Sequence, residues 1–437
     1  MKNKLKAGRH QASEAGDQTR SPQRKLWAPR EDSPRAREAG GIILYLSHCV
    51  PNPPNKGEKI RAHYEVMQLA RSHRLHLCCF ARNQAEVADA EKLKDVCASV
   101  YVEVLPRLAL PKALASFASG SCLNTAFYRS PRMLEHIERL AREVQFSATV
   151  AYSAVMGPFA PPGVPLIFDS VDVDSEKWLQ YAAVRRPSFL YALEARRMRA
   201  LEVRLGRQAC CTFLSTSAEL ALYQSFATGI HAKRMENGVD FDYFAPQPPP
   251  AHLAGRQAAV FIGAMDYYPN VDAACWFAND VFPLLRRAMP GAEFWIVGRN
   301  PTKAVRKLTR IPGITVTGAV PDIRPYIAAA SSIVAPLRIA RGIQNKVLEP
   351  LAMDKPVLVS GAVARTFAPD IPAGITSCES ASDYVESIVS PPVHRCIRES
   401  AIRRFSWKSN ISALEEELEK LERLKAKPQK VCPMVSN

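Results

Sequence analysis

Short, almost entirely apolar runs alternate with helix-like segments in two series along the chain, and a stretch rich in proline and glycine separates the series. The first series contains GIILYLSH, RLHLCCF, SVYVEVL, SATVAY, PLIFDS and ACCTFLS, and the second contains AAVFIGAM, EFWIVG, GITVTG, SSIVAPL and PVLVS. Runs without polar alternation are typical of parallel strands that are buried on both faces. The sequence therefore predicts an α/β fold with two Rossmann-like, doubly wound parallel-sheet domains.

Composition and turn residues divide the chain. Residues 1–40 carry ten basic and five acidic side chains with few large apolar ones, which predicts a disordered basic extension. An N-terminal domain is expected over 41–235, a linker over 236–256 and a second domain over 257–405. Within the first domain, an arginine-rich helix is expected over about residues 188–207.

The formal net charge of +16 indicates a polyanionic partner, such as nucleic acid, an anionic membrane face or phosphorylated ligands. Nucleic acid ranks last, because zinc-finger spacing and an RNA-binding aromatic run are both absent from the sequence. The eleven cysteines include no C-x-x-C pair and are expected to be reduced. We expect a cytoplasmic protein without a secretory signal or spanning helix, and the inner face of the cytoplasmic membrane is a candidate surface for it.

In a doubly wound sheet, ligands bind beyond the carboxyl ends of the strands. The loop after the first strand, SHCVPNPPNKGEKIR, places Gly57 before a helix start, with Lys56, Lys59 and Arg61 beside it. Backbone N–H groups and cations there would hold an anion. An ordinary solvated turn explains the same pattern equally well.

Three carboxylates follow another strand of the first domain, in FDSVDVDSEKW. Asp169, Asp172 and Asp174 stand at i, i+3 and i+5, a spacing that resembles a metal loop but lacks further ligands. Helix capping and hydrogen bonding to a substrate are favoured over metal binding. We expect Asp172, at the end of this strand, to orient a substrate hydroxyl.

The second domain repeats the strand–loop–helix arrangement twice. In FIGAMDYYPNVDA, Gly263 follows a strand and Asn270 lies in the first turn of a helix whose N–H groups face the ligand edge.

In APLRIARGIQNKVLE, a loop with two arginines and a glycine leads into a helix expected to begin near Ile343. Arg338, Arg341 and Lys346 suit a diphosphate, and Glu349, one turn deeper, suits the two hydroxyls of a ribose. A solvent-exposed i, i+3 Lys–Glu pair is the competing interpretation.

Several of these runs resemble one enzyme family. PNPPNKGEKIR, DSVDVDSEKWLQYA, ENGVDFDYF, GAMDYYPNVDA, VPDIRPY and APLRIARGIQNKVLE, spread over about residues 41–425, resemble runs of GT-B-fold, retaining glycosyltransferases of family four, and in particular the PEP-CTERM/exosortase-system-associated sugar transferases. The resemblance implies two domains facing each other across a cleft, and sugar transfer from a nucleoside-diphosphate sugar to a glycan or lipid-linked acceptor in exopolysaccharide or envelope glycan assembly. It also implies that Glu349 binds the ribose, that Lys346 lies at the diphosphate, and that residues 406–425 form a terminal helix that packs back on the N-terminal domain, followed by a disordered tail over 426–437.

The sequence also departs from this family. Arg341 stands where a second glutamate is common, Pro350 interrupts the helix after Glu349, and Asp354 stands where glycine usually ends the helix. No D-x-D motif occurs in the second domain, so we expect catalysis without a metal ion and without a cofactor.

The residues assigned to the nucleotide sugar are Gly263, Asn270, Arg338, Arg341, Gly342, Asn345, Lys346 and Glu349. The catalytic assignments are Asp172, Arg338 and Lys346, and the acceptor assignments are Lys56, Gly57, Lys59, Arg61, Asp169 and Asp174. A nucleotide-sugar epimerase of the same fold and a non-catalytic sugar-nucleotide-binding protein are the alternatives.

Overall fold

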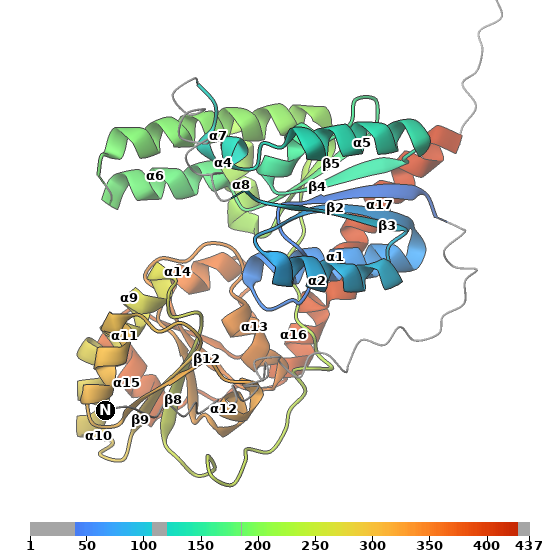
Figure 1. Ribbon diagram of the computed structural model, residues 1–437. Coiled ribbons are helices and arrows are strands. Elements are labelled where there is room, and N and C mark those ends of the chain that lie inside the picture. The colour runs from blue at the N-terminus through green and yellow to red at the C-terminus, as the bar shows by residue number, and fades with distance from the viewer. Residues whose placement is uncertain (1–39, 107–119, 185, 427–437) are drawn as a thin grey trace, which may run out of the picture.

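The computed structural model describes residues 40–106, 120–184 and 186–426, so the expected N-terminal extension and C-terminal tail lie outside the described residues, apart from Gly40 and Ala426. Two parallel sheets form the framework (Figure 1). The N-terminal sheet has seven strands in the order β3-β2-β1-β4-β5-β6-β7. Its strands are β1 (Ile42–Ser47), β2 (Arg74–Ala81), β3 (Ser99–Val104), β4 (Ala148–Tyr152), β5 (Leu166–Val171), β6 (Ala209–Leu214) and β7 (Ala232–Arg234).

The second sheet has six strands in the order β10-β9-β8-β11-β12-β13, again all parallel. Its strands are β8 (Ala258–Ile262), β9 (Glu293–Val297), β10 (Ile314–Gly318), β11 (Ser332–Ala335), β12 (Val357–Ser360) and β13 (Ile375–Cys378). The central strands are buried along almost their whole length, which explains why their sequences lack polar alternation. The predicted fold class, two Rossmann-like domains of the GT-B type, is confirmed.

Helices connect the strands in both domains. Those of the N-terminal domain are α1 (Gly57–Ser72), α2 (Gln84–Glu91), α4 (Leu123–Phe127), α5 (Pro131–Glu143), α6 (Asp174–Val184), α7 (Ser188–Gln208) and α8 (Ser217–Phe226). Those of the second domain are α9 (Tyr268–Trp276), α10 (Phe282–Ala288), α11 (Lys303–Lys307), α12 (Arg324–Ala329), α13 (Asn345–Ala352), α14 (Gly361–Ala364), α15 (Ala381–Val389) and α16 (Ile397–Phe405). None of the described helices is long and apolar enough to cross a membrane.

The last helix, α17 (Trp407–Ala426), returns to the first domain (Figure 1). Trp407, Ile411, Leu414 and Leu418 belong to the same buried apolar cluster as β1 and α1. The Trp407 ring also stacks on the ring of Tyr64 in α1, with 4.7 Å between ring centroids. The N-terminal domain is therefore completed by the C-terminal end of the chain.

Strand order fixes where each domain can bind a ligand. In the N-terminal sheet, the strands that follow β1 are added on one side of it, toward β3, and the strands from β4 onward are added on its other side, toward β7. In the second sheet, the same change of side occurs between β8 and β11. The crevice at such a switch point, beyond the carboxyl ends of the two central strands, is the usual ligand site of an open α/β sheet.

Candidate functional site

Three predicted residues of the second domain meet at its switch point. Lys346, in the first turn of α13, donates a hydrogen bond from Nζ to Oδ1 of Asn270 in α9. The amide of Asn270 in turn donates to the carbonyl oxygen of Ala264 at 2.9 Å. Gly263, directly after β8, leaves room for this pair, because a Cβ atom there would lie 2.7 Å from Nδ2 of Asn270 and 3.1 Å from Nζ of Lys346.

The charge state of Lys346 and Glu349 is set by their surroundings. Both side chains keep partial contact with solvent, yet desolvation lowers the pKa of Lys346 to about 7 and raises the pKa of Glu349 to about 8. Each charge favours the other, but this attraction is the smaller effect for both groups. At pH 7, both side chains are therefore partly or mostly uncharged. A charged ligand can shift the protonation of either group.

The charge of Glu349 acts on residues beyond its own helix. Its charge contributes to raising the pKa of Tyr64 in α1 and that of Tyr243 in the linker, after the larger effects of burial and of nearer aspartates. The Glu349 carboxyl group therefore lies within electrostatic range of the N-terminal domain.

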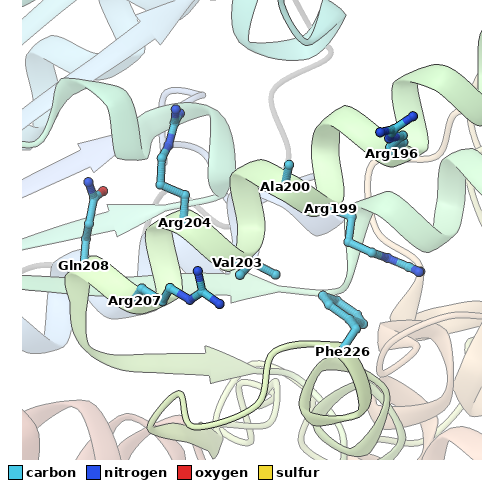
Figure 2. Close-up of a pocket in the computed structure, with 8 residues that line it drawn as sticks. All are labelled: Arg196, Arg199, Ala200, Val203, Arg204, Arg207, Gln208 and Phe226. Carbon is cyan, nitrogen blue, oxygen red and sulfur yellow. The ribbon is translucent and has the colours of Figure 1, made fainter.

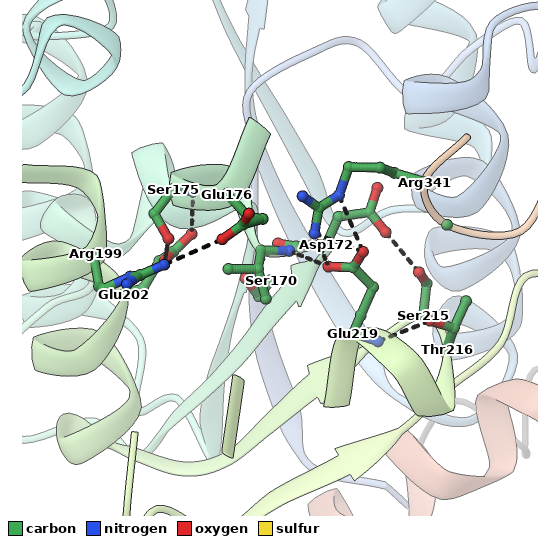
Figure 3. Close-up of polar contacts among 12 residues, drawn as sticks. Ser170, Asp172, Ser175, Glu176, Arg199, Glu202, Ser215, Thr216, Glu219 and Arg341 are labelled. Atoms are coloured by element: carbon green, nitrogen blue, oxygen red, sulfur yellow. Dashed lines mark hydrogen bonds and ion pairs between the residues drawn. The ribbon is translucent and has the colours of Figure 1, made fainter. Parts of the chain in front are cut away.

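The two predicted arginines of the β11–α13 loop have protein partners. Arg338 is 57% exposed and pairs with Asp272 of α9, with 2.8 Å between Nε and Oδ2. Arg341 binds Glu219 of α8 in the other domain, with Nη2 at 2.8 Å and 3.0 Å from the two carboxylate oxygens (Figure 3). Arg338 therefore lies at the edge of the second-domain site, whereas Arg341 links the two domains.

Asp172 lies at the same domain boundary. Its carboxylate accepts a hydrogen bond of 2.6 Å from the Ser215 hydroxyl, and a Cβ atom on Gly342 would come within 2.7 Å of Oδ1 (Figure 3). Gly342 has a φ of +62°, which favours glycine. The preceding Val171 has a φ of +66°, an unusual and strained value for a β-branched residue. The left-handed backbone at Val171 directly precedes Asp172, and Asp172 lies against the loop of the second domain.

The start and end of α13 differ in part from expectation. The helix begins at Asn345 rather than near Ile343, and Oδ1 of Asn345 is buried without a hydrogen-bond partner. Pro350 lies inside the helix, as its sequence position requires. Asp354 follows the helix in the left-handed conformation, with a φ of +59°, which confirms the prediction that an aspartate replaces the usual glycine there.

Three of the acceptor assignments fall on buried side chains with other partners. Arg61 is 1% exposed and Asp169 is 0% exposed, and they form an ion pair of 2.6 Å with each other. Lys59 is also buried and pairs with Glu86 at 2.8 Å. Because their charges are satisfied inside the domain, we correct these assignments: the three side chains hold α1 and α2 in place and present no free group to an acceptor.

Of the remaining acceptor assignments, Gly57 is exposed, and Lys56 and Asp174 are half-buried. Lys56 precedes α1, and the first residue of that helix, Gly57, has no neighbouring atom within 4 Å of the position a Cβ would take. Asp174 opens α6, and desolvation raises its pKa while Lys177 opposes the shift. Lys177 also interacts electrostatically with Tyr267 of the second domain. Asp174 therefore lies close to the domain boundary, and Lys56 and Gly57 border open space.

Sequence reasoning missed a group of residues at the N-terminal switch point. His48 directly follows β1 and stacks on Tyr152 at the end of β4, with 5.4 Å between ring centroids. Its Nδ1 atom is buried without a hydrogen-bond partner, and desolvation lowers its pKa. Arg82, after β2, pairs with Glu58 at 2.8 Å nearby. The position of His48 after the first strand was the only available signal, because a single histidine in a loop is not distinctive.

One cluster has the composition of a metal site. The ligand atoms of Cys211, His231 and Glu417 all lie within 4.8 Å of one another. However, Lys233 and Lys420 hold the Glu417 carboxylate at 2.7 Å and 2.8 Å. Two ammonium groups at the carboxylate oppose cation binding, so we interpret this cluster as an ion-pair network that fastens α17.

Comparison with known proteins agrees with this geometry. The family described as "Glycosyl transferases group 1" matches residues 256–390, which include all of the second-domain site. No curated protein matches the chain in sequence.

Solved structures match over most of the chain. Anabaena Alr3699/HepE, solved in complex with UDP-glucose, is 14% identical, with 87% of this chain and 100% of that chain covered and a TM-score of 0.59. WaaG, described as a glycosyltransferase involved in lipopolysaccharide biosynthesis, is 14% identical, with 88% and 100% covered and a TM-score of 0.54. An alpha,alpha-trehalose 6-phosphate synthase from Burkholderia multivorans is 10% identical, with 89% and 100% covered and a TM-score of 0.59.

Such distant likenesses establish the fold, and the fold is GT-B. With the group 1 domain that carries the site, the chain is a glycosyltransferase.

Proposed function

We propose that the chain is a retaining glycosyltransferase that moves a sugar from a nucleoside-diphosphate sugar to a lipid-linked or glycan acceptor. The observation that carries this proposal is the meeting of Lys346, Asn270 and Glu349 at the switch point of the second sheet. This set provides a cation and an amide for phosphate, and a carboxyl group for paired hydroxyls, at the usual ligand position of such a sheet.

The donor would be held by its nucleotide. Lys346 and the free N–H groups at the start of α13 would bind the diphosphate, and Glu349 would accept hydrogen bonds from the ribose. Arg338 would exchange Asp272 for a phosphate oxygen, which its exposed position allows. The solved HepE complex with UDP-glucose supports a donor of this class.

The reaction breaks the bond between the anomeric carbon and the diphosphate oxygen and forms a bond from that carbon to the acceptor oxygen. The acceptor proton passes to the leaving phosphate oxygen, so no side chain needs to act as the base. Lys346 and Arg338 stabilise the charge that develops on the diphosphate. Asp172, oriented by Ser215, would position the acceptor hydroxyl from the other domain.

This assignment needs neither a metal ion nor a cofactor, because the sequence provides cations rather than a D-x-D motif beside the donor. We further propose that the reaction belongs to exopolysaccharide or envelope glycan assembly of the exosortase-associated type, at the cytoplasmic face of an anionic membrane. The basic net charge and the resemblance of the sequence runs support this setting.

A two-stage experiment tests the proposal. The purified chain is first titrated with a panel of sugar nucleotides, and the donor that binds is then incubated with polyprenyl-linked acceptors and followed by mass spectrometry and by NMR of the anomeric proton. We expect diphosphate release only with an acceptor, and a product with the anomeric configuration of the donor. A changed sugar nucleotide without acceptor would indicate an epimerase, and binding without release under any acceptor would indicate a non-catalytic protein.

A further inference from the structure

The outward face of α7 combines arginines with an exposed aromatic ring. Phe189, Arg196, Ala200 and Arg207 stand seven, four and seven residues apart, close to whole turns of an α-helix, so they share one face. All four are exposed. At about 1.5 Å per residue, this face extends for roughly 30 Å along the N-terminal domain.

The opposite face of α7 holds the acidic residues of the helix. Glu194 and Glu202 are buried, and each accepts hydrogen bonds from backbone and side-chain groups inside the domain. Their charges therefore do not neutralise the outward face. This separation places the arginines together at the surface, with the acidic groups below.

A surface hollow of about 560 Å³ lies along this face (Figure 2). Its lining consists of Arg196, Arg199, Ala200, Val203, Arg204, Arg207, Gln208 and Phe226. Arg199 has partners, since it pairs with Glu176 at 3.2 Å and lies 4.5 Å above the Phe226 ring. Among the described residues, Arg196, Arg204 and Arg207 have no ion-pair partner, so three charges remain available.

The three arginines without ion-pair partners favour a ligand with several negative charges. Guanidinium groups match the oxygens of phosphate in paired hydrogen bonds, and several on one face attract a polyanion. Phe189 and Leu190, at the start of α7, are 66% and 40% exposed and add an apolar contact beside the basic stripe. A basic stripe with an exposed apolar end suits the headgroup region of a bilayer, because the cations meet lipid phosphates and the apolar side chains enter the headgroup layer, whereas the phosphates of a nucleic acid would use only the cations.

We infer that the outward face of α7 is the surface by which the chain docks on a membrane containing anionic phospholipids. The arginines bind lipid phosphates, and Phe189 enters the headgroup layer. This inference assigns a surface to the membrane association proposed above, and only that association links it to the proposed function. Helix α7 carries none of the donor-site residues.

Vesicle sedimentation with the full chain tests this inference. The chain is mixed with vesicles of phosphatidylcholine alone, or of phosphatidylcholine with about a third phosphatidylglycerol, and the bound fraction is measured. We expect binding only to the anionic vesicles, and loss of binding at high salt because charges are screened. The triple variant R196Q/R204Q/R207Q should bind at least about 10-fold more weakly, since each basic residue near an anionic surface contributes substantially.

A matched variant controls for total charge. R287Q/K307Q/R310Q removes three exposed charges from the second domain and should bind vesicles like the unmodified chain. Phe189→Ser should weaken binding at low salt without changing the salt dependence. Equal loss in both triple variants, or equal binding to neutral vesicles, would overturn the inference. So would loss of binding to a labelled oligonucleotide in R196Q/R204Q/R207Q without any loss of vesicle binding.

Sugar-nucleotide titration separates the two proposals. R196Q/R204Q/R207Q should keep its affinity for the donor, and Glu349→Ala should keep its affinity for anionic vesicles. A chain that binds vesicles through α7 but binds no sugar nucleotide would refute the proposed function and leave the docking surface standing.

Discussion

Arg341 of the second domain and Glu219 of the first are joined by three hydrogen bonds: Nη2 donates to both carboxylate oxygens at 2.8 Å and 3.0 Å, and Nε donates to Oε1 at 3.1 Å. The same carboxylate accepts the backbone N–H of Val173 at 2.8 Å, next to Asp172. One ion pair therefore links the donor-side loop to the segment that carries the proposed acceptor contact.

Breaking this link should loosen the domain boundary. Glu219→Ala leaves the Arg341 guanidinium, which is largely buried, without its carboxylate, so we expect the free energy of unfolding to fall by about 1–3 kcal/mol. Urea unfolding followed by tryptophan fluorescence measures the change. In a double-mutant cycle, Arg341→Met should lower the free energy of unfolding much less in the Glu219→Ala protein than in the unmodified chain. Additive losses would show that the pair does not couple the domains.

Glu349→Ala should weaken donor binding by roughly 10- to 100-fold, because hydrogen bonds to a charged or readily charged group contribute about 1.5–3 kcal/mol. Calorimetric titration with the sugar nucleotide identified in the panel measures the loss. Glu386→Ala, a matched change at an exposed position of helix α15, should leave the affinity unaltered. Undiminished affinity in Glu349→Ala would remove the ribose contact from the proposal.

Donor affinity should depend on pH through Lys346. Its pKa of about 7 in the free protein should rise when a diphosphate stabilises the ammonium form. Binding then takes up a proton above pH 7, so affinity is highest below pH 7 and falls by up to roughly tenfold per pH unit as pH rises. Titrations from pH 6 to pH 9 give this slope. Lys346→Arg stays charged throughout and should flatten it. An equal slope in both proteins would place the titrating group elsewhere.

The sequence predicted those features whose position follows from a local pattern of residues. Buried parallel strands have a readable apolar signature, so both sheets and their ligand edges could be predicted, and with them the loops of Gly263 and Lys346. A left-handed residue after a helix also has a local signal, as Asp354 shows.

Partners that come from distant segments have no such signal. Arg61 meets Asp169 across 108 positions, and Arg341 meets Glu219 across 122, so a charge near a ligand edge cannot be distinguished in sequence from one already paired. His48 was missed for the opposite reason, since its stacking on Tyr152 exists only once β1 and β4 are neighbours.

Gly263→Ala should damage the donor site while leaving the fold intact. The added methyl group would lie 2.7 Å from the Asn270 amide, so the Asn270–Lys346 pair must shift. We expect donor affinity to fall by roughly tenfold or more, since a misplaced contact of this kind costs about 1.4 kcal/mol or above, with an almost unchanged urea midpoint. Gly57→Ala, at a position with open space, is the matched control and should change neither quantity much. A Gly263→Ala protein with normal donor affinity would separate this glycine from the site.

Asp169 provides the test of the corrected acceptor assignment. Its carboxylate receives two hydrogen bonds from Arg61, at 2.6 Å and 2.8 Å, and Arg61 also donates to Glu65 and to the carbonyl oxygen of Met235. Because both members of the pair are buried, Asp169→Ala should lower the free energy of unfolding by about 3–5 kcal/mol. Asp95→Ala, an exposed change in the same domain, should have little effect, and Asp169→Asn should fall between the two, because the amide keeps one acceptor oxygen but no charge. If Asp169→Ala kept the urea midpoint of the unmodified chain and lost only turnover, the acceptor assignment of Asp169 would be correct and its structural role would be wrong.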